Sequence, residues 1–208
     1  MGNLLKVKVC GNTQSKNLKE VCNLQPDFIG FIFYDKSKRF VDSSDEIKQP
    51  LGVDAKRVGV FVNASEQEIV QKAEEFELDY IQLHGDETPE FCSKINQIKP
   101  VFKAFQVNNN FNFNILNIYL SSCYAFLFDT SSNQHGGSGK KFDWGLLQDY
   151  TLEKKFMLSG GINENDAEII NNIDHPKMMG IDLNSKFETR PGIKDITKLF
   201  NFLIQLRL

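Results

Sequence analysis

The stretch AFLFDTSSNQHGGSGKKFDW, residues 125–144, combines the features that decide the fold. Residues 125–128 are apolar and are typical of a buried strand, which ends on a single acid, Asp129. A polar loop with three glycines follows, and residues 142–144 lead into an apparent helix. Reacting groups lie at the C-terminal ends of parallel strands in both open α/β sheets and α/β barrels. We therefore predict an α/β protein in which Asp129 is catalytic, the alternative being an acid that caps the helix or orders the loop.

Similar apolar runs recur along the whole chain and alternate with segments that are mostly typical of helices. The predicted strands cover residues 6–10, 28–34, 57–62, 80–84, 101–107, 124–129, 156–159 and 178–183. The predicted helices cover residues 65–78, 88–98, 163–173 and 194–207, with weaker helical patterns at 111–122 and 42–52. Strands begin about 20 to 30 residues apart, close to one minimal strand–helix unit each.

Eight such units predict a single (β/α)8 TIM barrel as one domain over residues 1–208. The alternative is an open doubly wound sheet. Its usual signature, G-x-G-x-x-G after the first strand, is absent, because Cys10-Gly11-Asn12 carries one glycine.

Composition narrows the class of protein. The chain has 208 residues with 41% hydrophobic content, a net charge of −3 and a pI near 5.7, so no basic surface for nucleic acid is expected. No signal peptide or membrane span is recognisable. The four cysteines are widely spaced, which argues against a zinc site or a disulfide framework and favours the reduced cytoplasm.

In a barrel, the predicted strand ends bring Cys10, His84 and Asp129 to one rim. Cys10 follows the first strand, where the alternative to a functional thiol is a packed one. His84 follows the fourth strand and either contacts substrate or closes the strand by bonding to backbone.

Two further strand ends are typical of a phosphate site. Gly160 and Gly161 follow the seventh strand, and the segment with Asp182, Asn184 and Ser185 ends the eighth. Many barrels hold a phosphate on these two loops, although the glycines alone also suit tight turns. The basic run KSKR at residues 36–39 follows the second strand; such runs are usually solvated, but Arg39 can bind a carboxylate with two parallel hydrogen bonds.

Several short blocks, in order and at predicted strand ends, resemble phosphoribosylanthranilate isomerase, a (β/α)8 enzyme of tryptophan biosynthesis. The blocks are KVCG (8–11), GFIFY (30–34), KSKR (36–39), VGVFVN (58–63), QLHG (82–85), DT (129–130) with GGSGK (136–140) and FDW (142–144), and LSGG (158–161). The segment after the eighth strand departs from the family's common Ser-Ser-Gly, because it reads Asn184-Ser185-Lys186.

The resemblance implies an Amadori rearrangement of N-(5-phosphoribosyl)anthranilate without metal or organic cofactor. Cys10 matches the family's general base, Asp129 its general acid, and Arg39 the residue that holds the anthranilate carboxylate. The phosphate segments contain Gly160, Gly161, Asp182, Asn184 and Ser185.

The expected partner is a small phosphosugar, with no nucleic acid or membrane, and the protein is expected to be a monomer or a homodimer. One rival is the histidine-pathway isomerase, which resembles this chain in chemistry but has an aspartate where Cys10 stands. The others are a phosphosugar-binding protein without activity and a purely structural barrel.

Overall fold

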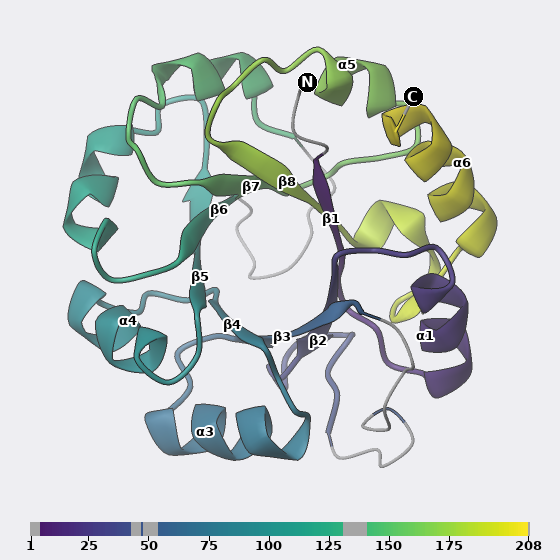
Figure 1. Ribbon diagram of the computed structural model, residues 1–208, viewed down its shortest axis with the longest axis horizontal. Helices are drawn as coiled ribbons and strands as arrows, with labels where there is room; N and C mark the ends of the chain where they lie inside the picture. The colour runs from purple at the N-terminus through teal and green to yellow at the C-terminus, as the bar shows by residue number, and fades with distance from the viewer. Residues whose placement is uncertain (1–4, 43–46, 48–53, 131–140, 208) are drawn as a thin grey trace.

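The computed structural model describes residues 5–42, 47, 54–130 and 141–207. Eight parallel strands form a closed barrel, and helices surround it as an outer ring (Figure 1). The strands are β1 (Lys6–Val9), β2 (Phe28–Ile32), β3 (Lys56–Phe61), β4 (Tyr80–Leu83), β5 (Val101–Val107), β6 (Ala125–Thr130), β7 (Phe156–Leu158) and β8 (Met178–Leu183). Each pairs with its neighbour in sequence and β1 pairs with β8, which confirms the predicted TIM barrel.

The connecting elements are α-helices and short 3₁₀ helices. They are α1 (Ser15–Cys22), α3 (Glu66–Glu75), α4 (Pro89–Asn96), η1 (Phe113–Tyr119), η2 (Trp144–Asp149), α5 (Ala167–Asn171), η3 (Ser185–Phe187) and α6 (Ile196–Arg207). The Ser65 and Thr88 side chains cap α3 and α4 by accepting hydrogen bonds from Glu68 N and Phe91 N. No helix in the described part of the chain is long and apolar enough to cross a membrane.

Local backbone conformation and side-chain contacts make several helices shorter than predicted. Glu77 adopts φ +50°, which ends α3 before residue 78 while Phe76 and Leu78 on either side stay buried. Asp166 accepts a hydrogen bond from Asn163 N at 2.7 Å, so a turn occupies the predicted first turn of the 163–173 helix. The asparagine-rich 111–122 segment forms η1, and most of the predicted 42–52 helix lies outside the described residues.

One pair of strands was not predicted. β9 (Glu188–Arg190) and β10 (Ile193–Lys194) form a small antiparallel sheet after β8, so Lys194 lies in a strand and α6 begins at Ile196.

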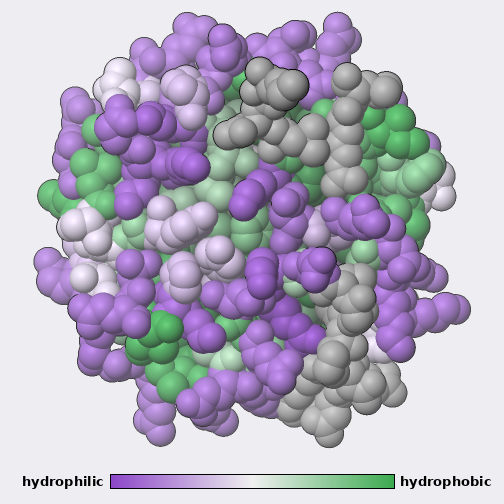
Figure 2. Space-filling model, viewed as in Figure 1, coloured by the Kyte–Doolittle hydropathy of each residue, from purple (hydrophilic) through white to green (hydrophobic). Residues whose placement is uncertain are grey.

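The core has two parts. Seven buried side chains form a cluster contributed by β2, β3, β5, β6 and β7: Phe28, Val58, Phe102, Ala104, Ala125, Leu127 and Met157. A larger cluster extends over the strands and the helices, with Leu18, Ile69 and Phe202 among its members. Hydrophilic residues cover most of the rim of the face shown in Figure 2, where hydrophobic residues lie in separate patches. Because core packing holds both strands and helices, the strand ends are rigid supports for a site.

Candidate active site

One cavity lies at the C-terminal ends of the strands and brings together every site residue that the sequence predicts. These are Cys10, Arg39, His84, Asp129, Gly160, Gly161, Asp182, Asn184 and Ser185. Cys10 follows β1, Arg39 lies in the loop after β2, and Asp129 lies near the end of β6. The glycine loop and His135 of the 125–144 stretch fall outside the described residues.

The cavity has an apolar wall and a polar one. Ile32, Val60 and Val62 supply aliphatic surface from β2, from β3 and from the residue that follows the end of β3. In the KSKR run, Lys36 and Lys38 are exposed, whereas Arg39 is 15% exposed and lines the cavity. An apolar wall beside a guanidinium suits a flat aromatic acid.

Cys10 is buried at 3% exposure, and its backbone N–H donates to the Leu183 carbonyl at 2.9 Å. A Cβ on Gly30 would lie 2.7 Å from Sγ, so glycine is needed there to give the thiol room. Burial raises the pKa of the Cys10 thiol, and the nearby Lys8 and Lys194 ammonium groups offset only part of this effect. At neutral pH the resting site therefore holds a thiol, not the thiolate that positive surroundings alone would favour.

A buried ion pair lies next to this thiol. Lys8 Nζ bonds to Asp182 Oδ2 at 2.8 Å, with exposures of 0% and 6%. Burial alone would lower the pKa of Lys8, but the Asp182 carboxylate and Cys10 outweigh it and raise that pKa above its usual value. Asp182 Oδ1 is buried without a hydrogen-bond partner among the described residues. These contacts direct Asp182 toward Lys8 and Cys10, and a carboxylate repels a phosphate.

The raised pKa predicts how Cys10 reacts with iodoacetamide. Only the thiolate is nucleophilic, so alkylation should be slow at pH 7 and rise about tenfold per pH unit beyond the usual thiol pKa of about 8.5. Mass spectrometry of the modified peptide measures this rate. The alkylation rate of Cys10 is compared with the rates of the other three cysteines in the same sample. Burial raises the pKa values of Cys22, Cys92 and Cys123 to about 11, 11 and 12. Fast alkylation of Cys10 at pH 7 would contradict the assignment.

Asp129 is held by contacts at both carboxylate oxygens. Oδ1 accepts a hydrogen bond from Thr130 N at 2.8 Å, and Oδ2 lies 3.2 Å from His84 Nε2. Gln82 Nε2 lies 2.8 Å from the other ring nitrogen of His84. A Cβ on Gly160 would come within 2.7 Å of Asp129 Oδ1, so that glycine leaves the space around the acid open. Asp129 is thus oriented, while 21% of its side chain stays exposed toward the cavity.

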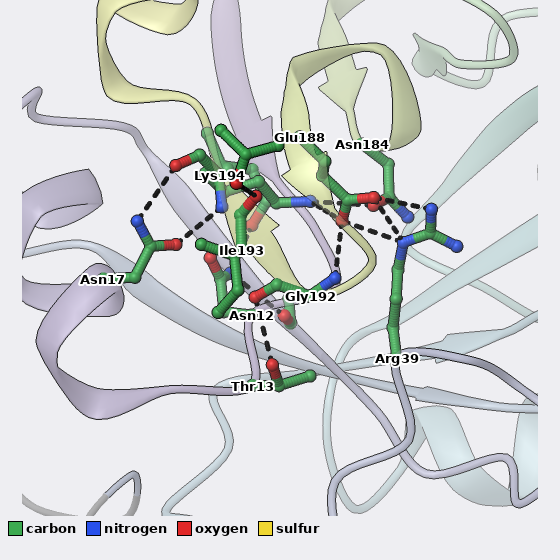
Figure 3. Close-up of polar contacts among 12 residues, drawn as sticks. Asn12, Thr13, Asn17, Arg39, Asn184, Glu188, Gly192, Ile193 and Lys194 are labelled. Atoms are coloured by element: carbon green, nitrogen blue, oxygen red, sulfur yellow. Dashed lines mark hydrogen bonds and ion pairs between the residues drawn. The ribbon is translucent and has the colours of Figure 1, made fainter.

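Arg39 binds a carboxylate of the protein itself. Its Nε lies 2.9 and 3.0 Å from the two oxygens of Glu188, and its Nη2 lies 2.6 Å from Oε2 (Figure 3). Glu188 is not among the residues that the sequence predicts for the site, and neither are Lys8, Gln82 and Lys194. The blocks KVCG and QLHG contain Lys8 and Gln82 and were a usable signal, whereas Glu188 and Lys194 belong to the small sheet that was not predicted.

The loops after β7 and β8 line the same side of the cavity. Gly160 and Gly161 both have positive φ, +88° and +68°, a conformation that glycine adopts readily and that lets the backbone approach a ligand closely. Asn184 and Ser185 are half-buried beside them in the lining. Such a pair of loops can hold an anion. Among the described residues, no three His, Cys, Asp or Glu side chains are placed to bind a metal ion.

Comparison with known proteins points to one family. The family model described as N-(5'-phosphoribosyl)anthranilate (PRA) isomerase matches residues 7–205. A relative of that name from Parabacteroides distasonis is 45% identical over an alignment of 204 residues that covers 96% of this chain and 92% of the relative. Another from Phocaeicola vulgatus is 40% identical over 202 residues, 97% of each chain.

Solved structures agree with the sequence comparisons. The phosphoribosyl anthranilate isomerase of Thermotoga maritima superposes with a TM-score of 0.85 at 33% identity, covering 97% of this chain and 98% of that one. A phosphoribosyl anthranilate isomerase solved with reduced 1-(o-carboxyphenylamino)-1-deoxyribulose 5-phosphate gives 0.82 at 31% identity over the same shares. With its barrel, its cavity and these matches taken together, the chain belongs to the N-(5'-phosphoribosyl)anthranilate isomerase family.

Proposed function

We propose that this chain converts N-(5'-phosphoribosyl)anthranilate to 1-(2-carboxyphenylamino)-1-deoxyribulose 5-phosphate in tryptophan biosynthesis, with Asp129 as general acid and Cys10 as general base. The observation that carries the roles is the single cavity that joins a thiol from the end of β1 to a carboxylate from β6. The rearrangement needs one proton donor and one proton acceptor acting at different atoms of a small sugar.

The steps follow from these positions. Asp129 gives its proton to the ribose ring oxygen, the bond from that oxygen to C1 breaks, and the aniline nitrogen lone pair forms an iminium. The Cys10 thiolate then takes the C2 proton, and the electrons of that bond neutralise the iminium to give an enolamine. The enolamine tautomerises to the ketone. Because the iminium beside C2 makes its proton acidic, a small thiolate fraction suffices to start the second step.

The rest of the cavity supplies binding. Arg39 is proposed to hold the anthranilate carboxylate, with the aliphatic wall against the aromatic ring. Gly160, Gly161, Asn184 and Ser185 are proposed to hold the phosphate, as their loops suit an anion. For Asp182, the contacts with Lys8 support a role beside Cys10 and the sugar hydroxyls in place of the predicted phosphate role.

Replacing Arg39 with methionine should raise KM by about ten- to a hundredfold while kcat changes little. The carboxylate that Arg39 is proposed to bind is present in both the ground state and the transition state. Removing the guanidinium therefore weakens the binding of both states equally. Steady-state kinetics over a range of substrate concentrations separate the two constants. A fall in kcat with unchanged KM would contradict the binding role.

The proposed function also includes the extent of the domain, the oligomeric state and the cellular compartment. One domain over residues 1–208 is supported by the family match across 7–205. A homodimer remains a candidate beside the monomer, since the Thermotoga maritima enzyme is described as dimeric. A reducing cytoplasm suits a base that must stay a free thiol, and all four cysteines are free in the structure.

The direct test of the proposed function is a turnover assay with substrate generated in situ. The purified protein is incubated with N-(5'-phosphoribosyl)anthranilate, and loss of the substrate's fluorescence is followed. Rapid loss of fluorescence supports the isomerase. Binding without turnover would instead support a phosphosugar-binding protein, and turnover of the histidine-pathway substrate would support the relative with that chemistry.

A further inference from the structure

The small sheet after β8 carries two buried opposite charges, which contact two residues of the cavity lining, Arg39 and Asn184. Glu188 of β9 and Lys194 of β10 are register partners, and their side chains are 3% and 0% exposed. Lys194 Nζ lies 2.7 Å from Glu188 Oε1, and Gly192 N donates to the same oxygen at 3.1 Å. Asn17 fixes the strand itself by bonding to both the N–H and the carbonyl of Lys194 (Figure 3).

Glu188 holds Arg39 by one particular edge. The guanidinium presents Nε and Nη2 to the carboxylate, which is its side edge, and the three distances are 2.9, 3.0 and 2.6 Å. Within the described part of the chain, Nη1 of Arg39 has no hydrogen-bond partner. The terminal edge of the guanidinium, Nη1 with the second hydrogen of Nη2, is therefore the edge that a second carboxylate can use.

The same carboxylate is connected to Asn184 through Lys194. Lys194 Nζ donates to Asn184 Oδ1 at 2.8 Å as well as to Glu188. Burial would raise the pKa of Glu188, but its hydrogen bonds with Arg39 and the charge of Lys194 hold that pKa below the usual value. Glu188 is thus an anion that links Arg39 to Asn184 through Lys194, and the Arg39 and Asn184 side chains lie close together, since a Cβ on Gly11 would come 2.6 Å from Arg39 Cδ and 2.9 Å from Asn184 Oδ1.

Stability alone is a weak reason for this arrangement. Replacing buried ionic groups by packed apolar side chains is often neutral or stabilising, whereas here Glu188 and Lys194 hold Arg39 and Asn184, two residues that line the cavity. We propose that Glu188 is a positioning residue for the isomerase, which fixes the guanidinium of Arg39 so that its terminal edge receives the aromatic carboxylate of the substrate. The proposal rests on the proposed function, because it assigns that carboxylate to Arg39.

The first test is the Glu188→Gln variant, which keeps the size of the side chain and removes its charge. A misplaced binding group commonly costs up to about a hundredfold, so we expect KM to rise about ten- to a hundredfold with kcat within a fewfold. Glu153→Gln is the matched control, since Glu153 forms an ion pair with Lys177 on the surface and should leave both constants unchanged. Circular dichroism and thermal melting establish that both variants fold.

The second test distinguishes positioning from a general structural role. With N-(5-phosphoribosyl)aniline, which lacks the carboxylate, Glu188→Gln should change kcat/KM by less than about threefold. In an Arg39→Met background, Glu188→Gln should likewise add almost nothing. Equal losses with both substrates, or additive losses in the double variant, would overturn the proposal.

A variant that does not fold and a failure of the proposed function can each be distinguished from a failure of the positioning role. If Glu188→Gln does not fold, Glu188→Asp keeps the charge but shortens its reach, and the same substrate comparison is applied to it. If the wild-type protein binds the anthranilate substrate but does not turn it over, the proposed function fails. Failure of the positioning role alone appears as normal wild-type turnover with equal losses on both substrates.

Discussion

The Asp129→Asn variant should lose about 10²- to 10⁴-fold in kcat, the usual contribution of one positioned proton donor. The amide keeps the shape of the side chain and the hydrogen bond that Thr130 N donates to Oδ1. It has no acidic proton for the ribose ring oxygen, so ring opening is slowed while the binding groups stay in place. Turnover is measured by substrate fluorescence, and equilibrium binding of a reduced product analogue should change by less than about threefold.

Asp149→Asn is the matched control for this prediction. Asp149 is exposed in η2 and does not line the cavity, so the same chemical change there should leave kcat as it is. Near wild-type turnover in Asp129→Asn would remove Asp129 from the mechanism. Loss of analogue binding together with kcat would show that the variant disturbs the site as a whole, including His84, which lies 3.2 Å from Oδ2.

The Cys10→Ala variant should lose a comparable 10²- to 10⁴-fold or so in kcat, because it removes the acceptor for the C2 proton. Cys10→Ser should not restore activity, since a hydroxyl has almost no anion at neutral pH. Alanine is smaller than cysteine and leaves the positions of Gly30 and Leu183 unchanged, so the analogue should still bind. The measurement is again kcat against analogue affinity.

Cys22→Ala is the control for deleting a thiol elsewhere. Cys22 is buried in α1 and does not line the active-site cavity, so its loss acts on packing and thermal stability, with kcat unchanged. If Cys10→Ala kept wild-type turnover, the base would have to be another group of the cavity, and the carboxylate of Asp182 would be the first to test.

The barrel could be predicted because apolar, β-rich runs recur at regular intervals along the chain and several of them lack clean alternation, as expected of strands that are covered on both faces. Helix ends were harder, because they depend on single side-chain contacts. Asp166 binds Asn163 N and delays α5, and Glu77 ends α3 by taking a positive φ that no periodicity reveals. β9 and β10 are too short, at three and two residues, for a hydrophobic pattern to identify.

The site residues that lie at strand ends could be predicted, because the strands themselves could. Cys10, His84 and Asp129 sit at or next to the ends of strands, and chain order alone brings them to one rim. Arg39 was a candidate because its basic run follows the second predicted strand, and the resemblance of that block implied its role in holding the anthranilate carboxylate. Glu188 could not be found, because its function depends on the distance to Arg39, 149 residues away in the chain.

The pairing of β1 with β8 has a consequence for synthesis on the ribosome. Lys8 faces Asp182 across this seam, 174 residues later in the chain, and Cys10 N bonds to Leu183. The thiol therefore leaves the exit tunnel long before Asp182 and Lys194, which supply its charged surroundings together with Lys8. Until the C-terminal strand emerges, the nascent chain carries a solvated cysteine beside an unpaired lysine, and the enzyme acquires its proton acceptor only when the ring closes.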